Sequence, residues 1–247
     1  MGRKKRKKVH LRWDKIVAML TVAAIVVSGI IIYNDFHKGK EQSRTVNSTV
    51  SANASAKTEK KTICIDAGHG GNDSGAEYKS LKEKNLTLDM ALAVKEKLEK
   101  KGFNVVMTRT KDEYVDLEER TSISNNANAV ALVSIHKNDT SSRDSQIRGI
   151  ESWIYSLCPK DSYALADSIH KKLSKVSGIV DRGVKTGTTE NAATNYAINT
   201  KSASASCILE LGFINNEKDN ALINKQKDAI AQAIADGIEE YTNRTEK

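Results

Sequence analysis

Proline, cysteine and aromatic residues are all scarce in this chain of 247 residues. A single proline excludes a collagen-like or proline-rich extended protein. Aromatic residues make up only 5% of the sequence, too few to suggest a surface that stacks nucleic-acid bases. No segment repeats at a fixed period, which excludes a solenoid. With 28% charged and 39% hydrophobic residues, most of the chain has the composition of a folded globular domain.

The three cysteines do not form the pattern of a disulfide-stabilised protein. Such a protein would have an even number at a higher density. Cys64 and Cys207 both lie within strongly apolar, strand-like runs, so we expect them to be buried as small hydrophobic side chains. No two cysteines, Cys158 included, are spaced as a CxxC pair, and the sequence therefore predicts no thiolate zinc site.

Positive charge is concentrated at the N-terminus. The net charge is +8, and residues 1–15, with eight Lys or Arg and one Asp, account for +7 of it. The rest of the chain is therefore close to neutral, at +1. A nucleic-acid-binding domain needs a basic face to neutralise phosphates, so we expect no nucleic-acid partner.

Residues 16–33 carry no charge and are almost entirely apolar. A helix of this length spans roughly 27 Å, close to the thickness of a bilayer core. Trp13 and Tyr33 stand at its two ends, where aromatic side chains favour the membrane interface. The basic segment 1–15 precedes it, so the positive-inside rule predicts a cytoplasmic N-terminus and a single-pass anchor. Residues 34–60 are polar and small, and we expect a flexible linker outside the membrane.

A cleaved signal peptide is the alternative to this anchor. Signal peptides have a shorter apolar core, followed closely by a small-x-small cleavage site. The nearest such site, at residues 52–54, lies far beyond the end of the apolar run. The pattern favours an uncleaved anchor and leaves cleavage open.

Strand-like and helix-like patterns alternate from residue 61 to residue 244. This alternation predicts an α/β domain, a three-layer sandwich with a mostly parallel central sheet. Ligands of such folds bind at the carboxyl ends of the strands. The expected strands are 62–65, 103–107, 129–135, 149–155 and 206–211, and the expected helices are 86–101, 117–128, 162–176 and 225–241.

Two histidines stand at equivalent positions of this predicted sheet. His69 follows the first strand within a glycine-rich loop, and His136 ends the most apolar strand. A single histidine at such a place is often a capping or core residue, but two together point to a metal site. Catalytic zinc takes three protein ligands and keeps one position open. Glu83, Glu77 and Asp73 could each supply the third ligand, and their spacing does not choose among them.

Glu210 is a charged residue inside an apolar strand. Burial of a lone carboxylate is unfavourable, so its side chain should face a polar site or a metal. A buried structural salt bridge is the alternative. Beside a metal-activated water, such a carboxylate would be the natural general base.

These residues belong to a series of motifs that resembles a known family. Residues 63–76, ICIDAGHGGNDSGA, resemble the opening motif of the zinc-dependent N-acetylmuramoyl-L-alanine amidases, often called amidase 3. The resemblance covers residues 61 to about 242. Further matching motifs follow in the family's order at 83–88, 106–109, 117–120, 133–138, 149–151 and 208–216.

The resemblance implies an activity and assigns roles. Zinc would be held by His69, Glu83 and His136, which selects Glu83 over Glu77. Zinc would polarise the amide between N-acetylmuramic acid and L-alanine in peptidoglycan, and Glu210 would assist the attacking water and protonate the departing amine. The matched motifs also include Arg109 and Asn138, which we expect to contact the substrate.

The resemblance also bears on location and partners. It places the anchored protein in a bacterial cell membrane, with its zinc amidase domain outside. The compact build is similar to that of spore-cortex amidases, and the need for a protein activator stays open. Lys137 replaces a small residue beside His136, where it could influence substrate charge preference. Two alternatives remain: another exported zinc peptidase acting on wall stem peptides, or an inactive wall-binding module.

Overall fold

A six-stranded sheet lies at the centre of the computed structural model, which describes residues 60–140 and 146–244. The first four strands in spatial order are parallel to one another. The fifth is antiparallel to the fourth, and the sixth is parallel to the fifth. The predicted α/β fold with a mostly parallel sheet is therefore confirmed. The order is β4 (Asn104–Met107), β1 (Thr62–Ala67), β5 (Ala131–Asn138), β8 (Ala205–Phe213), β6 (Ile150–Ile154) and β7 (Asp181–Thr186).

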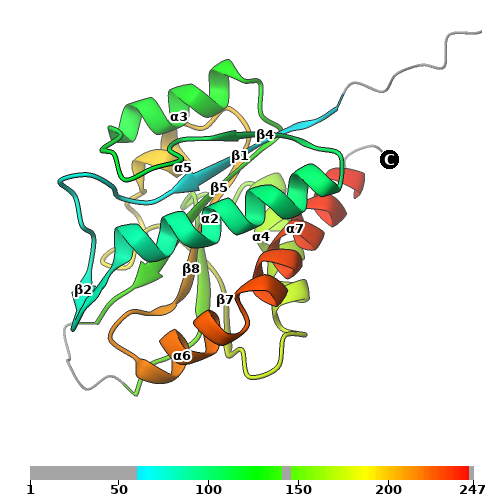
Figure 1. Ribbon diagram of the computed structural model, residues 1–247. Helices are drawn as coiled ribbons and strands as arrows, with labels where there is room; N and C mark the ends of the chain where they lie inside the picture. Colours follow the sequence, from blue (N-terminus) through cyan, green and yellow to red (C-terminus); the bar gives the residue numbers. More distant parts are fainter. Residues whose placement is uncertain (1–59, 141–145, 245–247) are drawn as a thin grey trace, which may run out of the picture. The chain divides into compact units, whose positions relative to one another are not determined.

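Helices cover both faces of the sheet and complete three layers (Figure 1). One face carries α2 (Glu83–Lys100), α4 (Lys160–Leu173) and α7 (Lys227–Arg244). The other face carries α3 (Leu117–Asn126) and α5 (Ala197–Lys201). Three shorter elements lie outside these layers: a two-stranded hairpin of β2 (Glu77–Tyr78) and β3 (Leu81–Lys82), and α6 (Glu217–Lys225) after β8.

The central strands are apolar on both sides because both sides are covered. Alternate residues of β1 separate into two cores: Ile63 and Ile65 pack with α2, α4 and α7, whereas Cys64 packs on the opposite side. Leu132 of β5 and Ile198 of α5 complete that second, smaller core. The period of two along each strand thus fixes which side chains meet which helices.

The structure differs from the expected elements where the sequence is polar. Strand β7 has little apolar character, yet it forms the edge of the sheet by pairing with β6. The final helix expected at 225–241 is present as α7 at 227–244, and a separate helix that was not predicted, α6, precedes it and ends before Gln226. The helix expected at 86–101 begins three residues earlier, at Glu83. This early start places a carboxylate in the first helical turn, where the helix dipole favours it.

The predicted N-terminal segments 1–15 and 16–33, and the linker 34–60 except its last residue, lie outside the described residues. Within the described ranges, no helix is both long and apolar enough to cross a membrane. The anchor and its topology therefore stay predictions.

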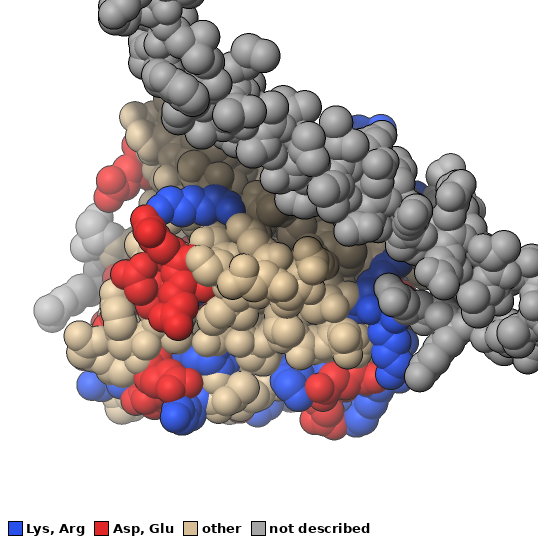
Figure 2. Space-filling model, turned by 90° about the horizontal axis from the view of Figure 1, so that it is seen from above, with Lys and Arg blue, Asp and Glu red and all other residues tan. Residues whose placement is uncertain are grey.

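All three cysteines are free thiols. Cys64 and Cys207 are buried as predicted, and burial raises the pKa of each thiol to about 12. Cys158, by contrast, is exposed. In the part of this face that Figure 2 leaves uncovered, basic and acidic side chains are interspersed around other residues.

Candidate active site

The loop after β1 places His69 at the carboxyl edge of the sheet. His69 has a φ of 61°, and a pair of backbone hydrogen bonds between Gly70 and Asp73 closes the turn that follows it. Gly68 lies directly against the imidazole of His136, since a Cβ atom there would come within 2.4 Å of its Cε1. Only glycine allows this close approach between the loop and β5.

Glu83 lies in the first turn of α2, on a different segment of the chain from His69. Its Oε1 accepts hydrogen bonds from the Lys137 backbone N–H (2.9 Å), and its Oε2 accepts from the Ala76 backbone N–H (3.0 Å). These bonds fix both oxygens toward the two histidines. Gly75 makes room for this arrangement, because a Cβ there would approach the Glu83 carboxylate to 2.7 Å.

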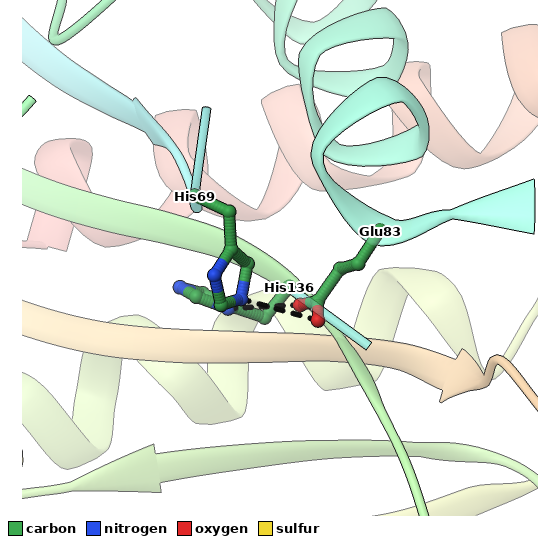
Figure 3. Close-up of side chains that lie close together, drawn as sticks. All are labelled: His69, Glu83 and His136. Carbon is green, nitrogen blue, oxygen red and sulfur yellow. Dashed lines mark hydrogen bonds and ion pairs between the residues drawn. The ribbon is translucent and has the colours of Figure 1, made fainter. Parts of the chain in front are cut away.

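His69, Glu83 and His136 converge on one point (Figure 3). His69 Nε2 lies 3.1 Å from Glu83 Oε2, and His136 Nδ1 lies 3.0 Å from Glu83 Oε1. The two rings meet edge to face, with centroids 4.9 Å apart. One potential ligand atom from each of the three residues lies within 4.8 Å of the others. Two imidazole nitrogens and one carboxylate form a donor set that fits zinc.

The electrostatics of this cluster favour a bound cation. Burial opposes the ionisation of Glu83, but hydrogen bonds from His136 and His69 hold its pKa well below its usual range. Burial alone would lower the pKa of His136, but the hydrogen bond and charge of Glu83 raise it to about 9. The negative charge of Glu83 favours protonated imidazole rings. When the rings are deprotonated, the same charge would favour a metal ion bound between them.

The structure also places the other two candidate carboxylates. Asp73 Oδ2 lies 2.8 Å from Nδ1 of His69, on the side of the ring away from Glu83. A carboxylate in that position orients a histidine whose other nitrogen binds metal. Glu77 is exposed in β2 and pairs with Lys82. Of the three, only Glu83 joins the cluster with both histidines.

Glu210 lies next to His136, because these two residues are register partners on the parallel strands β5 and β8. Both line a small cavity of about 130 Å³ between the sheet and α5. Glu210 is 8% exposed, and its Oε2 has no hydrogen-bond partner among the described residues. Burial raises its pKa to about 7, with His136 opposing this shift and Glu83 adding to it. A structural salt bridge, the alternative considered for this residue, is absent from this part of the structure.

Arg109 is placed differently from the expectation that it contacts substrate. It is 2% exposed, and its Nη2 donates to the carbonyl oxygens of Gly68 and Lys84, at 2.8 Å each. Gly68 precedes His69, and Lys84 follows Glu83. Arg109 therefore connects the two segments that carry these side chains, and its role is one of positioning.

A second buried arginine supports the same loop. Arg120 donates to the carboxylate of Asp66 (2.7 Å) and to the carbonyl of His69 (2.8 Å). Neither Arg120 nor Asp66 was predicted from the sequence as a site residue. The sequence did contain a signal for Asp66, because it is a charged residue directly at the end of a buried strand.

The two remaining candidates lie beyond the histidine cluster. The Asn138 amide donates to Glu151 (3.1 Å), so its contact with substrate stays a prediction. The side chain of Lys137 lies in a cavity with residues of α2 and α6, separate from the small cavity that holds Glu210. His136 lines both cavities, and an influence of Lys137 on the charge preference for substrate stays a prediction.

Known proteins resemble this chain over the domain that carries the site. The sequence matches the family Amidase_3, described as N-acetylmuramoyl-L-alanine amidase, over residues 63–240. The chain belongs to this amidase family. Its match includes the three converging residues and Glu210.

Relatives within the family extend the comparison. A protein named "Probable cell wall amidase LytH" from Staphylococcus epidermidis is 35% identical over 188 residues, covering 73% of this chain and 58% of the relative. The chain thus spans little more than half the length of this relative. The "Sporulation-specific N-acetylmuramoyl-L-alanine amidase" of Bacillus subtilis is also 35% identical over 188 residues, covering 73% of this chain and 68% of the relative.

A solved family structure has the same fold. The CwlD amidase from Clostridioides difficile, solved in complex with the GerS lipoprotein, superposes with a TM-score of 0.67 at 31% identity. The match covers 74% of this chain and 99% of that chain. The layers described above are therefore those of a family amidase domain.

Proposed function

We propose that the protein is a zinc-dependent cell-wall hydrolase that cleaves the amide bond between N-acetylmuramic acid and L-alanine in peptidoglycan. The observation that carries this proposal is the convergence of His69, Glu83 and His136 beside the unpartnered carboxylate oxygen of Glu210. Three ligands with an adjacent carboxylate are what a metal-assisted amide hydrolysis requires. Membership of the amidase family, and the names of its relatives, support this choice of substrate.

The metal and Glu210 have different roles in this reaction. Zinc, when bound, supplies Lewis-acid polarisation of the amide carbonyl and of an attacking water. Glu210 accepts a proton from that water as the new C–O bond forms, and then gives the proton to the departing nitrogen as the C–N bond breaks. The products are the lactyl carboxylate of the sugar and a free L-alanine amino group. A carboxyl with a pKa of about 7 suits both proton transfers.

Location and partners form a second part of the proposal. Residues 16–33 would anchor the protein as a single-pass membrane protein of a bacterium, with residues 1–15 in the cytoplasm and the amidase domain outside. The complex of the Clostridioides difficile relative with a lipoprotein supports the idea that a protein activator acts on this chain as well. A role in sporulation would follow the relative from Bacillus subtilis.

The test is an assay of the full chain on intact peptidoglycan, with and without a zinc chelator. We expect stem peptides with a new L-alanine amino terminus, released only when zinc is present. New amino termini elsewhere in the stem peptide would instead identify a zinc peptidase. Folded, zinc-loaded protein that binds the wall without cleaving it, even with a candidate activator present, would identify a binding module.

A further inference from the structure

A second, larger cavity lies beside the candidate active site, on the side of the sheet covered by α2. Its volume is about 390 Å³, which is within the range of small-molecule sites. Its walls come from α2, α6, the start of α7 and the ends of β5 and β8. Half of the lining residues are apolar, and these include Leu86, Met90, Ile135, Leu211 and Ile223.

Lys137 brings a cationic side chain into this apolar cavity. The residue is 6% exposed, and within residues 60–140 and 146–244 its Nζ forms no hydrogen bond or ion pair. The nearby carboxylate of Asp219 is already engaged by the backbone N–H groups of Gly149 (2.8 Å) and Phe213 (3.0 Å). A buried ammonium group without a partner is unfavourable, so a bound anion would stabilise it.

Lys227 is the second lysine of the cavity and provides the contrast. Its Nζ binds both oxygens of Asp89, at 2.8 and 2.9 Å, and its side chain is 41% exposed. The charge of Lys227 is thus balanced by the protein itself. Of these two lysines, Lys137 alone is left to pair with a ligand.

Asn220 adds an acceptor to the same cavity. Its Nδ2 donates to the carbonyl oxygen of Ile214 at 2.6 Å, which fixes the orientation of the amide. Its Oδ1 is buried and has no hydrogen-bond partner in the described part of the chain. The cavity therefore holds one unpaired cation among apolar side chains, and one of its lining residues carries a buried, unpaired acceptor.

We propose that this cavity binds a small amphipathic carboxylate, with the carboxylate group on Lys137 and the apolar part against α2 and α6. An N-acylated amino acid has both features, a carboxylate and a short apolar side chain. The carboxyl end of a peptide has the same chemistry, so the ligand is either a free acid or part of the peptidoglycan substrate. The second of these sources rests on the proposed function.

The test is a calorimetric titration of the full chain with N-acetylalanine and with N-acetylalaninamide, which lacks the negative charge. We expect a Kd on the order of 1 mM for the acid. The amide should bind about tenfold more weakly or less well still, because it forms no charge-assisted hydrogen bond with Lys137. Equal binding of the two compounds, or no binding of the acid, would overturn the proposal.

Three variants keep the test independent of a folding defect. Lys137→Met should weaken binding of the acid by about tenfold or more, whereas the matched Lys227→Met should change it by less than about twofold. Ala221→Phe leaves Lys137 intact but obstructs the cavity at an exposed position, and it should also abolish binding. Retained binding in both Lys137→Met and Ala221→Phe, with unfolding temperatures like the wild type, would exclude this cavity as the site.

A kinetic measurement separates the two sources of the ligand. If the cavity holds the carboxylate of the substrate, N-acetylalanine should raise KM for peptidoglycan fragments with the wild type but not with Lys137→Met, and kcat of the wild type should not change. If the ligand is a free acid, the titration should show binding while KM stays constant. The titration does not depend on amidase activity, so a failure of the proposed function would leave its result interpretable.

Discussion

Glu210 and His136 are register partners on adjacent parallel strands, so their side chains lie on the same face of the sheet. His136 belongs to the cluster that fits a metal ion, and Glu210 carries an unpartnered carboxylate oxygen beside that cluster. Neither position depends on a long loop, because the backbone pairing of β5 and β8 sets both. The sheet itself thus fixes the distance between the candidate metal ligand and the candidate general base.

The first prediction separates catalysis from metal binding. Glu210→Gln removes the proton acceptor but keeps the shape of the side chain, and it should lower kcat/KM on peptidoglycan about a thousandfold. Zinc content, measured by atomic emission, should remain at one per chain. The control is Glu96→Gln on the exposed side of α2, whose ion pair with Lys100 contributes little. Loss of zinc together with activity would make Glu210 a ligand instead of a base.

The second prediction concerns the ligands. His136→Ala should abolish stoichiometric zinc binding, since two protein donors are too few for a stable catalytic site. Asp73→Asn should retain zinc with an affinity reduced about ten- to a hundredfold, because Asp73 orients His69 without joining the cluster. Competition with a chelator measures both affinities. Full zinc occupancy in His136→Ala would refute the assigned ligand set.

The third prediction tests Arg109 as a positioning residue. Arg109→Lys keeps the positive charge but cannot bind the carbonyl groups of Gly68 and Lys84 through one planar group. Zinc affinity should fall about tenfold, as it does when groups that orient ligands are lost. Arg244→Lys, near the C-terminus, serves as control. A lower unfolding temperature of the metal-free protein with an unchanged zinc Kd would reduce Arg109 to a purely structural role.

The fourth prediction follows from the buried pair of Asp66 and Arg120. Burial opposes ionisation of Asp66, but the Arg120 guanidinium and two hydroxyl groups lower the pKa of this carboxyl below its ordinary value of 3.8. A lowered pKa in the folded state means that the carboxylate stabilises the fold above pH 4 or so, and that this stabilisation is lost as the pH falls further. Asp66→Asn should therefore destabilise the protein by about 3–5 kcal/mol near neutral pH.

The pH dependence of this difference provides the check. Denaturant unfolding of the metal-free wild type and of Asp66→Asn should give free energies that differ by a constant amount above about pH 5 and converge as the pH falls from about 4 to about 2. The other titrating groups are shared by the two proteins and largely cancel. A constant difference across this range would show that the ionised form of Asp66 is not the source of the stabilisation.

The apolar strands and most helices were predictable from the sequence, including the polar helix α3, whereas the polar edge strand β7 was not. The buried runs that become β1 and β5 stand out because both of their faces are covered. Strand β7 gives no such signal: Arg182 and Lys185 extend from it to pair with Glu151 of the neighbouring strand. An edge strand stabilised by ion pairs needs its partner, which only the three-dimensional arrangement supplies.

The site was predictable to a similar extent. His69 and His136 could be found because each follows an apolar strand, whereas Glu83 was selected only through the family resemblance. Its contact with the histidines depends on a long-range connection, in which the backbone of residues 74–76 binds the start of α2. Sequence spacing does not encode such a connection. Lys137, by contrast, directly follows His136 in β5, so the period of two places the two side chains on opposite faces of the sheet.

The distribution of thiols has a practical consequence. Cys158 is exposed, whereas Cys64 and Cys207 are buried with raised pKa values, so a maleimide should react with the native protein at one position among these three. Cys158 follows β6, which runs antiparallel to β8, and it therefore lies toward the edge of the sheet opposite His136. A fluorophore or a solid support attached there would leave the candidate active site open to polymeric substrate.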